Sequence, residues 1–352
     1  MNKKIIEMSK EELNENIQSE NIQVCVIGIG RIGLPTALSF ANSGFNTIGV
    51  DINENLVEKI NKGIFPLKDE PGYDVMFDKV RSENFFKATS KIENILSNSD
   101  VILLSLPTPM NSSNVPNYSA LQSVGQQLHD FLSNGSLVIV ESTIEPGFVE
   151  NILIPIIEGD DKKLKAGKDF AIGVCPETAN PGQILNDFEK LPRLVGAIDD
   201  ATKDMITKIY RHVFTVDLIP MPNCKTANAV KLTTNVFRDL NIAFVNELAI
   251  LFEKLGIDIM TVLEAAKTKY NFQIHYPGPG VGGPCLPVNS YQYLNTAKEI
   301  GLSLKLVETA REVNESMPLH VVKLLSDAFN EQSKLLKDST ILLLGVSYKP
   351  DV

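Results

Sequence analysis

Two patterns of apolar residues divide the sequence. As far as about residue 220, short unbroken runs of valine, isoleucine and leucine alternate with segments whose apolar residues are spaced as on a helix. Runs of this kind are typical of parallel strands that are buried on both faces. We therefore predict an α/β fold with a Rossmann-like sheet covered by helices. The predicted strands are Val24–Ile27, Thr47–Val50, Val101–Leu104, Leu137–Val140, Phe170–Val174 and Arg193–Gly196.

The pattern changes after Pro222. The segment Cys224–Leu255 contains no proline or glycine, and its apolar residues follow the period of a helix. This length predicts one long helix that joins two domains and has a face free to pair with a second subunit. Helical patterns continue to about Tyr270 and return between about Ser290 and Leu336, which predicts a helical middle domain.

The two ends of the chain predict further elements. Residues 1–20 are charged, and Ser9 and Glu12 have the spacing of a capping box, so we expect an accessory helix there. Residues 339–345 resemble another buried parallel strand. A lone strand cannot bury its own faces, so we expect it to begin a second Rossmann-like domain that is truncated at Val352.

Composition excludes several classes of protein. The 352 residues are enough for roughly two or three domains. A net charge of −10 and the absence of a Lys/Arg cluster argue against a nucleic-acid surface. The four cysteines lack CxxC spacing and the four histidines are scattered, which argues against a metal site or a disulfide framework. No apolar run has the length of a membrane span and no secretory leader is present, so we expect a cytoplasmic protein.

A glycine fingerprint, GIGRIG, follows the first predicted strand. Its glycines allow a tight turn, a close approach of a pyrophosphate and close packing of a helix on the strand. Asp51 ends the second strand, where a carboxylate binds ribose hydroxyls and repels a 2′-phosphate, which predicts NAD rather than NADP. The alternative is a structural turn beside an unrelated aspartate. The predicted cofactor contacts are Gly28, Gly30, Arg31, Ile32, Gly33, Asp51, and Thr108 and Thr143 after the third and fourth predicted strands.

The fourth cysteine lies at the end of an unusual loop. Between Tyr276 and Cys285 the chain has four glycines and three prolines. Glycine lets backbone N–H groups approach a ligand, and proline limits the freedom of the loop. A thiol presented in this way can attack an electrophile. The alternative is a small apolar residue packed in a tight loop.

Several separate segments together resemble one family, the UDP-glucose/GDP-mannose dehydrogenases, which oxidise the C6 alcohol of a nucleotide sugar to a uronic acid with two NAD⁺. The resemblance runs from about residue 22 to the end of the chain. Its FRDLNIAFVNEL run and GPGVGG loop are most similar to members that act on UDP-N-acetyl-D-mannosamine. The segments are Asn61–Pro66, Glu70–Gly72, Leu106–Pro109, Ser142–Gly147, Cys175–Glu177, Lys231–Leu248, Gly278–Cys285 and Ser347–Pro350.

The resemblance implies catalytic roles for five residues. Cys285 matches the thiol that takes the C6 aldehyde as a thiohemiacetal and then holds it as a thioester. Lys231 and Asn235 match the pair that binds the C6 oxyanion and a water molecule. Thr143 matches a hydroxyl that positions water, and Glu177 a carboxylate that assists hydrolysis of the thioester.

The resemblance also implies substrate contacts, a domain division and a biological setting. The domains are an accessory helix (1–20), an NAD-binding domain (21–221), a central domain for dimerisation (222–336) and the first strand of a UDP-binding domain (337–352). A homodimer or larger homo-oligomer through the central helix and a role in polysaccharide biosynthesis are expected. The implied substrate contacts are Glu177, Thr178, Lys231, Asn235, Arg238, Lys269, Asn271, Tyr276, Gly282 and Lys349.

Some positions depart from the family pattern. Asn289 stands where family loops often carry an aspartate, so it cannot accept a proton as a carboxylate does. Thr178 replaces an arginine, and Leu56 replaces an arginine near the adenosine. Lys269 and Asn271 stand where a histidine and an arginine are found in mannosamine-type members.

Three functional hypotheses remain from the sequence. The first is four-electron oxidation of UDP-N-acetyl-D-mannosamine, with UDP-N-acetylglucosamine and UDP-glucose as alternative substrates. A two-electron hydroxy-acid dehydrogenase would share the glycine fingerprint but would not need Cys285. A catalytically decayed protein that only binds NAD and a UDP-sugar is the third.

Overall fold

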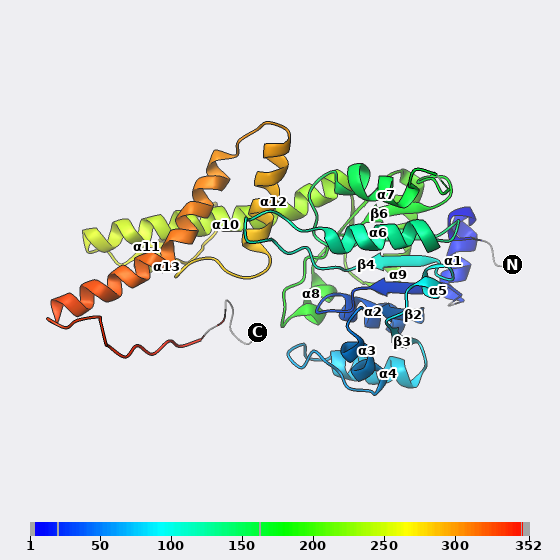
Figure 1. Ribbon diagram of the computed structural model, residues 1–352, viewed down its shortest axis with the longest axis horizontal. Coiled ribbons are helices and arrows are strands. Elements are labelled where there is room, and N and C mark those ends of the chain that lie inside the picture. The colour runs from blue at the N-terminus through cyan, green and yellow to red at the C-terminus, as the bar shows by residue number, and fades with distance from the viewer. Residues whose placement is uncertain (1–3, 20, 162, 346, 348–352) are drawn as a thin grey trace. The chain divides into compact units, whose positions relative to one another are not determined.

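The computed structural model describes residues 4–19, 21–161, 163–345 and 347, and it divides into two compact units (Figure 1). The first unit holds the residues up to Thr108 together with Asn117–Lys231. The second holds Pro109–Pro116 together with the chain from Leu232 onward.

A single sheet forms the centre of the first unit. In the described chain it has eight strands, in the order β3-β2-β1-β4-β5-β6-β7-β8. Neighbouring strands run parallel except for β6 and β7, which are antiparallel. The strands are β1 (Gln23–Ile27), β2 (Asn46–Val50), β3 (Phe86–Thr89), β4 (Val101–Leu104), β5 (Leu137–Val140), β6 (Ala171–Val174), β7 (Arg193–Ala197) and β8 (Leu218–Pro220).

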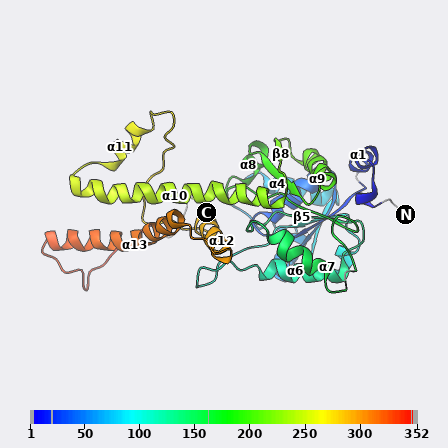
Figure 2. The same cartoon turned by 90° about the horizontal axis from the view of Figure 1, so that it is seen from above.

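Helices cover both faces of this sheet, as Figures 1 and 2 show. Val24 and Val26 of β1 pack in a core with residues of α2, α4, α8 and α9, whereas Cys25 and Ile27 pack in a second core with α6 and α7. This alternation explains why the strands are apolar throughout. The bounds are η1 (Ile5–Glu7), α1 (Lys10–Gln18), α2 (Gly33–Asn42), α3 (Glu54–Asn61), α4 (Tyr73–Ser82), α5 (Glu93–Leu96), α6 (Ser119–Phe131), η2 (Val149–Leu153), α7 (Ile154–Glu158), α8 (Ile184–Lys190) and α9 (Asp200–Val213).

The second unit is helical. It is built from α10 (Cys224–Leu255), α11 (Ile259–Ala266), α12 (Leu286–Glu299) and α13 (Lys305–Glu331). The prediction of one unbroken helix over 224–255 is confirmed, and its first turns belong to the first unit. The loop that carries Cys285 connects α11 to α12.

The structure confirms some local predictions and corrects others. The accessory helix is present as α1, with the Ser9–Glu12 capping box formed. The strands β3 and β8 were not predicted, and the expectation of parallel pairing is wrong between β6 and β7. Residues 339–345 form no strand, and Leu344 there is 89% exposed. No described strand lies beside this segment to accept its backbone hydrogen bonds, and a strand needs such a neighbour.

Within the described ranges, no helix combines the length and the apolar character needed to cross a membrane. The same residues contain no group of three or more side chains that could hold a metal ion.

Candidate functional site

The glycine fingerprint forms a tight turn between β1 and α2. Gly28 has a φ of +87°, and a Cβ there would lie 2.6 Å from the Ser105 carbonyl oxygen. A Cβ on Gly33 would lie 1.9 Å from the Gly28 carbonyl oxygen, so only glycine allows this packing of helix on strand. A Cβ on Gly30 would meet nothing within 4 Å. The turn therefore packs tightly against the protein at Gly28 and Gly33 and leaves open space at Gly30. A pyrophosphate at the N-terminus of α2 requires this open space.

Asp51 lies at the same edge of the sheet. Ile27 of β1 is in register with Val50 of β2, so the residues that follow these strands are neighbours. The Ile29 N–H donates to Asp51 Oδ2 (3.1 Å) and the Asn53 N–H donates to Oδ1 (2.9 Å). A carboxylate has further lone pairs, so Asp51 can also accept hydrogen bonds from ribose hydroxyls. This geometry fits the adenosine half of a dinucleotide.

Thr108 and Thr143 meet beyond the ends of β4 and β5. The Thr108 hydroxyl donates to the Thr143 carbonyl oxygen at 2.9 Å. Ser142 reinforces the crossing, because its hydroxyl accepts from the Leu106 N–H at 2.8 Å. The structure thus brings these two predicted cofactor contacts together at the carboxyl edge of the sheet, where open α/β sheets bind ligands.

Glu177 is held in place by a buried arginine. Its Oε2 lies 2.7 Å from Nη1 of Arg193, which is 2% exposed. Its Oε1 accepts the N–H groups of Thr178 and Ala179 at 2.6 and 2.7 Å. The Arg193 guanidinium also lies over the rings of Phe188 and Phe214. Glu177 therefore has a fixed position, with one oxygen beside a cation and the other bound to two backbone N–H groups.

A second carboxylate, Glu141, lies in the same buried cluster. It accepts hydrogen bonds from the hydroxyls of Tyr210 (2.6 Å) and Ser105 (2.8 Å). Burial raises the pKa of Glu141, and the charge of Arg193 only partly opposes this shift. The positive charge of Arg193 thus stabilises two acidic side chains, Glu141 and Glu177. The sequence analysis missed it, although an arginine within an apolar strand is rarely buried without a partner.

Cys285 differs from the other three cysteines. It is exposed and occupies the N-cap position of α12, whereas Cys25, Cys175 and Cys224 are buried. Burial raises the pKa of the Cys175 and Cys224 thiols to about 12, so they are inert at neutral pH. The sulfur of Cys285 is therefore accessible to a substrate, and it lies at the N-terminus of a helix.

A chain of buried amides links α10 to α12, the helix that begins directly after Cys285. Asn235 on α10, one turn after Lys231, donates from Nδ2 to Oδ1 of Asn289 at 2.6 Å. Asn289 donates in turn from Nδ2 to Oε1 of Gln292 at 2.9 Å. All three side chains are at most 9% exposed. The amide at position 289 therefore accepts from one neighbour and donates to the other.

Comparison with known proteins identifies the family. Residues 22–214 match the NAD-binding domain of the UDP-glucose/GDP-mannose dehydrogenase family, and residues 225–316 match the central domain of the same family. The chain belongs to this family.

Individual relatives agree with the assignment to the UDP-glucose/GDP-mannose dehydrogenases. A UDP-N-acetyl-D-mannosamine dehydrogenase of Pyrococcus horikoshii is 36% identical over 93% of this chain and 76% of its own length. A Campylobacter jejuni protein of the same name is 35% identical over 94% of this chain and 79% of its own length. The solved structure of the P. horikoshii UDP-D-ManNAc dehydrogenase has a TM-score of 0.83 at 35% identity, covering 89% of this chain and 73% of that one.

Membership of the UDP-glucose/GDP-mannose dehydrogenase family confirms two predictions made from the sequence. The chain has a Rossmann-type NAD-binding domain and a helical middle region. It is an oxidoreductase that uses NAD and acts on a nucleotide sugar.

The remaining predicted cofactor and substrate residues range from ion-paired to exposed. Arg31 forms ion pairs with Asp69 and Glu70 and so ties the glycine turn to that segment. The Tyr276 hydroxyl donates to Glu264 at 3.1 Å. Ile32 is the N-cap residue of α2, and Thr178 is half-buried next to Glu177. Arg238, Lys269, Asn271 and Gly282 are exposed, and Lys349 lies outside the described residues.

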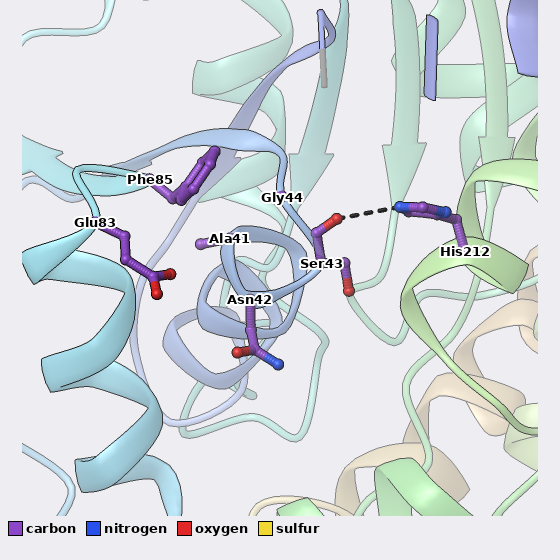
Figure 3. Close-up of a pocket in the computed structure, with 7 residues that line it drawn as sticks. All are labelled: Ala41, Asn42, Ser43, Gly44, Glu83, Phe85 and His212. Atoms are coloured by element: carbon purple, nitrogen blue, oxygen red, sulfur yellow. Dashed lines mark hydrogen bonds between the residues drawn. The ribbon is translucent and has the colours of Figure 1, made fainter. Parts of the chain in front are cut away.

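A surface hollow of about 380 Å³ lies elsewhere in the dehydrogenase (Figure 3). It surrounds the end of α2, where the Ser43 carbonyl oxygen is 3.1 Å from Nε2 of His212. This part of the chain leads into β2, so the hollow is at the amino edge of the sheet. The glycine turn and Asp51 are at the carboxyl edge, so the hollow is not part of the NAD site.

Proposed function

We propose that this enzyme oxidises the C6 alcohol of UDP-N-acetyl-D-mannosamine to UDP-N-acetyl-D-mannosaminuronate. The names of the relatives at 36% and 35% identity support this substrate. The observation that carries the proposal is Cys285, the exposed thiol at the N-cap of α12. Oxidation of an alcohol to a carboxylate removes four electrons, and a thiol adduct lets one enzyme perform both steps.

The proposed reaction proceeds through bonds to Cys285. Loss of a hydride and a proton converts the C6 alcohol to an aldehyde, and Sγ adds to the aldehyde carbon to give a thiohemiacetal. Loss of a second hydride and of the hydroxyl proton gives a thioester, and water hydrolyses the thioester to the carboxylate and the free thiol. NAD⁺, when bound, accepts one hydride in each oxidation.

Lys231 and Asn235 are proposed to bind the C6 oxygen. They are one helical turn apart on α10 and so share a face. The ammonium group of Lys231 stabilises negative charge on that oxygen, and the amide chain through Asn289 fixes the carboxamide of Asn235. Asn289 is an amide, so it orients groups and takes no proton.

Glu177 and Thr143 are proposed to act on the hydrolytic water. The contacts of Glu177 with Arg193 and with two backbone N–H groups fix the position of its carboxylate. A carboxylate with a fixed position can orient a water molecule. Substrate contacts are proposed for Thr178, Arg238, Lys269, Asn271, the loop from Tyr276 to Gly282, and Lys349.

The pyrophosphate of NAD is proposed to bind at the glycine turn, and Asp51 is proposed to accept hydrogen bonds from the ribose of the adenosine. The residues proposed for the turn are Gly28, Gly30, Arg31, Ile32 and Gly33. The proposed domains are 1–20, 21–221, 222–336 and 337–352.

The central helix is proposed to join two copies of the chain. Phe237, Phe244 and Leu251 on α10 are 45%, 50% and 49% exposed, which is a large apolar area for a monomer. We expect Phe244→Glu to convert a dimer to monomers in light scattering after gel filtration. An unchanged mass would place the subunit contact elsewhere.

The substrate proposal is tested with a panel of UDP-sugars. We expect the highest kcat/KM with UDP-N-acetyl-D-mannosamine and two NADH per sugar, with the uronate identified by mass spectrometry. One NADH per sugar would indicate a two-electron dehydrogenase, and none with any sugar would indicate a binding protein. A higher kcat/KM with UDP-N-acetylglucosamine or UDP-glucose would reassign the sugar and leave the reaction unchanged.

The role of Asp51 predicts the choice of cofactor. The wild-type enzyme should prefer NAD⁺ to NADP⁺, because the carboxylate binds ribose hydroxyls and repels a 2′-phosphate. Asp51→Ala should lower kcat/KM for NAD⁺ roughly tenfold or more, the effect of a lost hydrogen bond to a charged group. Asp51→Asn, which keeps the size and loses the charge, should remove most of the discrimination against NADP⁺. Equal kcat/KM values for the two cofactors in the wild type would contradict this role.

A further inference from the structure

A buried ion pair lies at the centre of the helical unit. Asp239, on α10, is 0% exposed, and Arg311, on α13, is 4% exposed. Nη1 of Arg311 donates to Oδ1 of Asp239 at 2.9 Å and to Oδ2 at 3.2 Å. A carboxylate in such a pair only accepts hydrogen bonds, so every other group that meets Asp239 must be a donor.

One series of hydrogen bonds leads from Asp239 to the cysteine loop. Asn314 donates from Nδ2 to Oδ1 of Asp239 at 2.7 Å, which leaves its Oδ1 to accept from Nδ2 of Asn246 at 2.9 Å. Asn246 then has its Oδ1 free to accept the N–H of Gly278 at 2.9 Å. The same Nδ2 of Asn314 also donates to the backbone carbonyl oxygen of Asp239 at 3.0 Å. Each amide has one acceptor end, so the carboxylate and the backbone carbonyl of Asp239 together fix the direction of both amides, and the series ends in an acceptor for the loop.

A second bond leads from Asp239 to the other side of the cysteine. The Ser290 hydroxyl donates to Oδ2 of Asp239 at 2.6 Å. Ser290 is in α12, five residues after Cys285, and Gly278 is seven residues before it. The same buried carboxylate therefore holds the chain on both sides of Cys285.

We propose that Asp239 is a positioning residue for Cys285, acting through Asn314, Asn246 and Ser290 on the two segments that flank the thiol. This inference rests on the proposed role of Cys285 as the nucleophile. Buried polar networks favour one arrangement of the chain, and a nucleophile misplaced by about 1 Å can cost a hundredfold in rate. A purely structural ion pair would stabilise the helices without controlling the loop.

The test uses Asn246→Ala, which removes the acceptor for Gly278 and leaves the Asp239–Arg311 pair intact. Hydrogen exchange of the Gly278 amide should become roughly tenfold faster, as expected for the loss of a buried hydrogen bond. Exchange in the body of α10 should stay at the wild-type rate. The kcat for the UDP-sugar should fall roughly tenfold or more while KM for NAD⁺ is unchanged. Asp239→Asn should also weaken the hold on the loop, because an amide has one oxygen and cannot accept from Arg311, Asn314 and Ser290 together.

Glu315→Gln is the matched control. Glu315 is half exposed and bonds Arg311 and Tyr291, so the substitution removes a charge from the same helices without breaking a bond to the loop. It should leave the exchange at Gly278 and kcat as in the wild type. Wild-type exchange at Gly278 in Asn246→Ala, or an equal loss of kcat in Glu315→Gln, would overturn the proposal. If no UDP-sugar is oxidised by the wild type, the proposed function fails, and the exchange measurement still decides whether this network holds the loop.

Discussion

Cys285→Ser should lower steady-state turnover by roughly three or more orders of magnitude. A hydroxyl is a far weaker nucleophile than a thiolate, and an ester intermediate is hydrolysed more slowly than a thioester. Binding of NAD⁺ should be unaffected, since the glycine turn and Asp51 belong to the other unit. The measurements are the rate of NADH release and calorimetric titration with NAD⁺.

The matched control for this prediction is Cys224→Ala. It also removes a thiol, but one that is fully buried at the start of α10. We expect its turnover per folded molecule to equal that of the wild type. Near-normal turnover in Cys285→Ser would remove covalent catalysis from the mechanism.

Lys231→Ala should lower kcat roughly 10²- to 10³-fold, the usual cost of removing a group that stabilises an oxyanion. Both oxidation and hydrolysis should slow, because Asn289 provides no carboxylate to share the task. Single-turnover kinetics with mass spectrometry of the protein should then detect a sugar adduct on Cys285. Asn289→Asp should be tolerated or should raise the rate of hydrolysis.

Lys225→Ala is the control for the loss of a cation from the same helix, because Lys225 is exposed two turns earlier on α10. It should react at the wild-type rate. If Lys231→Ala also reacted at the wild-type rate, with no sugar adduct on Cys285, α10 would have only a structural role.

The elements that the sequence predicts well are those with strong local signals. The strand β1, the turn at Gly28 and the 32-residue helix α10 follow from apolar period, glycine spacing and the absence of helix-breaking residues. The strand β3 was missed because it is short and alternates buried with exposed residues at the edge of the sheet. The direction of β7 could not be predicted, because periodicity is the same in parallel and antiparallel strands.

In the candidate site, too, local signals in the sequence predicted some residues and missed the long-range contacts. The sequence indicated Glu177 but not Arg193, and the cysteine loop but not the Asp239 network. Arg311 and Asp239 are 72 residues apart in the sequence, and their contact depends on how α10 and α13 pack. Nor could local signals show that the apolar run at 339–345 has no neighbouring strand in the part of the chain that the structure describes.

The accessibility of a single thiol has a consequence for oxidative damage. Peroxide converts an exposed cysteine to a sulfenic acid, which a second thiol can trap as a reversible disulfide. The other three cysteines of the chain are buried, so none can reach an oxidised Cys285. Further oxidation to the sulfinic acid is irreversible. The protein therefore depends on external small thiols for protection, and activity lost in air should return with reductant only while Cys285 is still at the sulfenic stage.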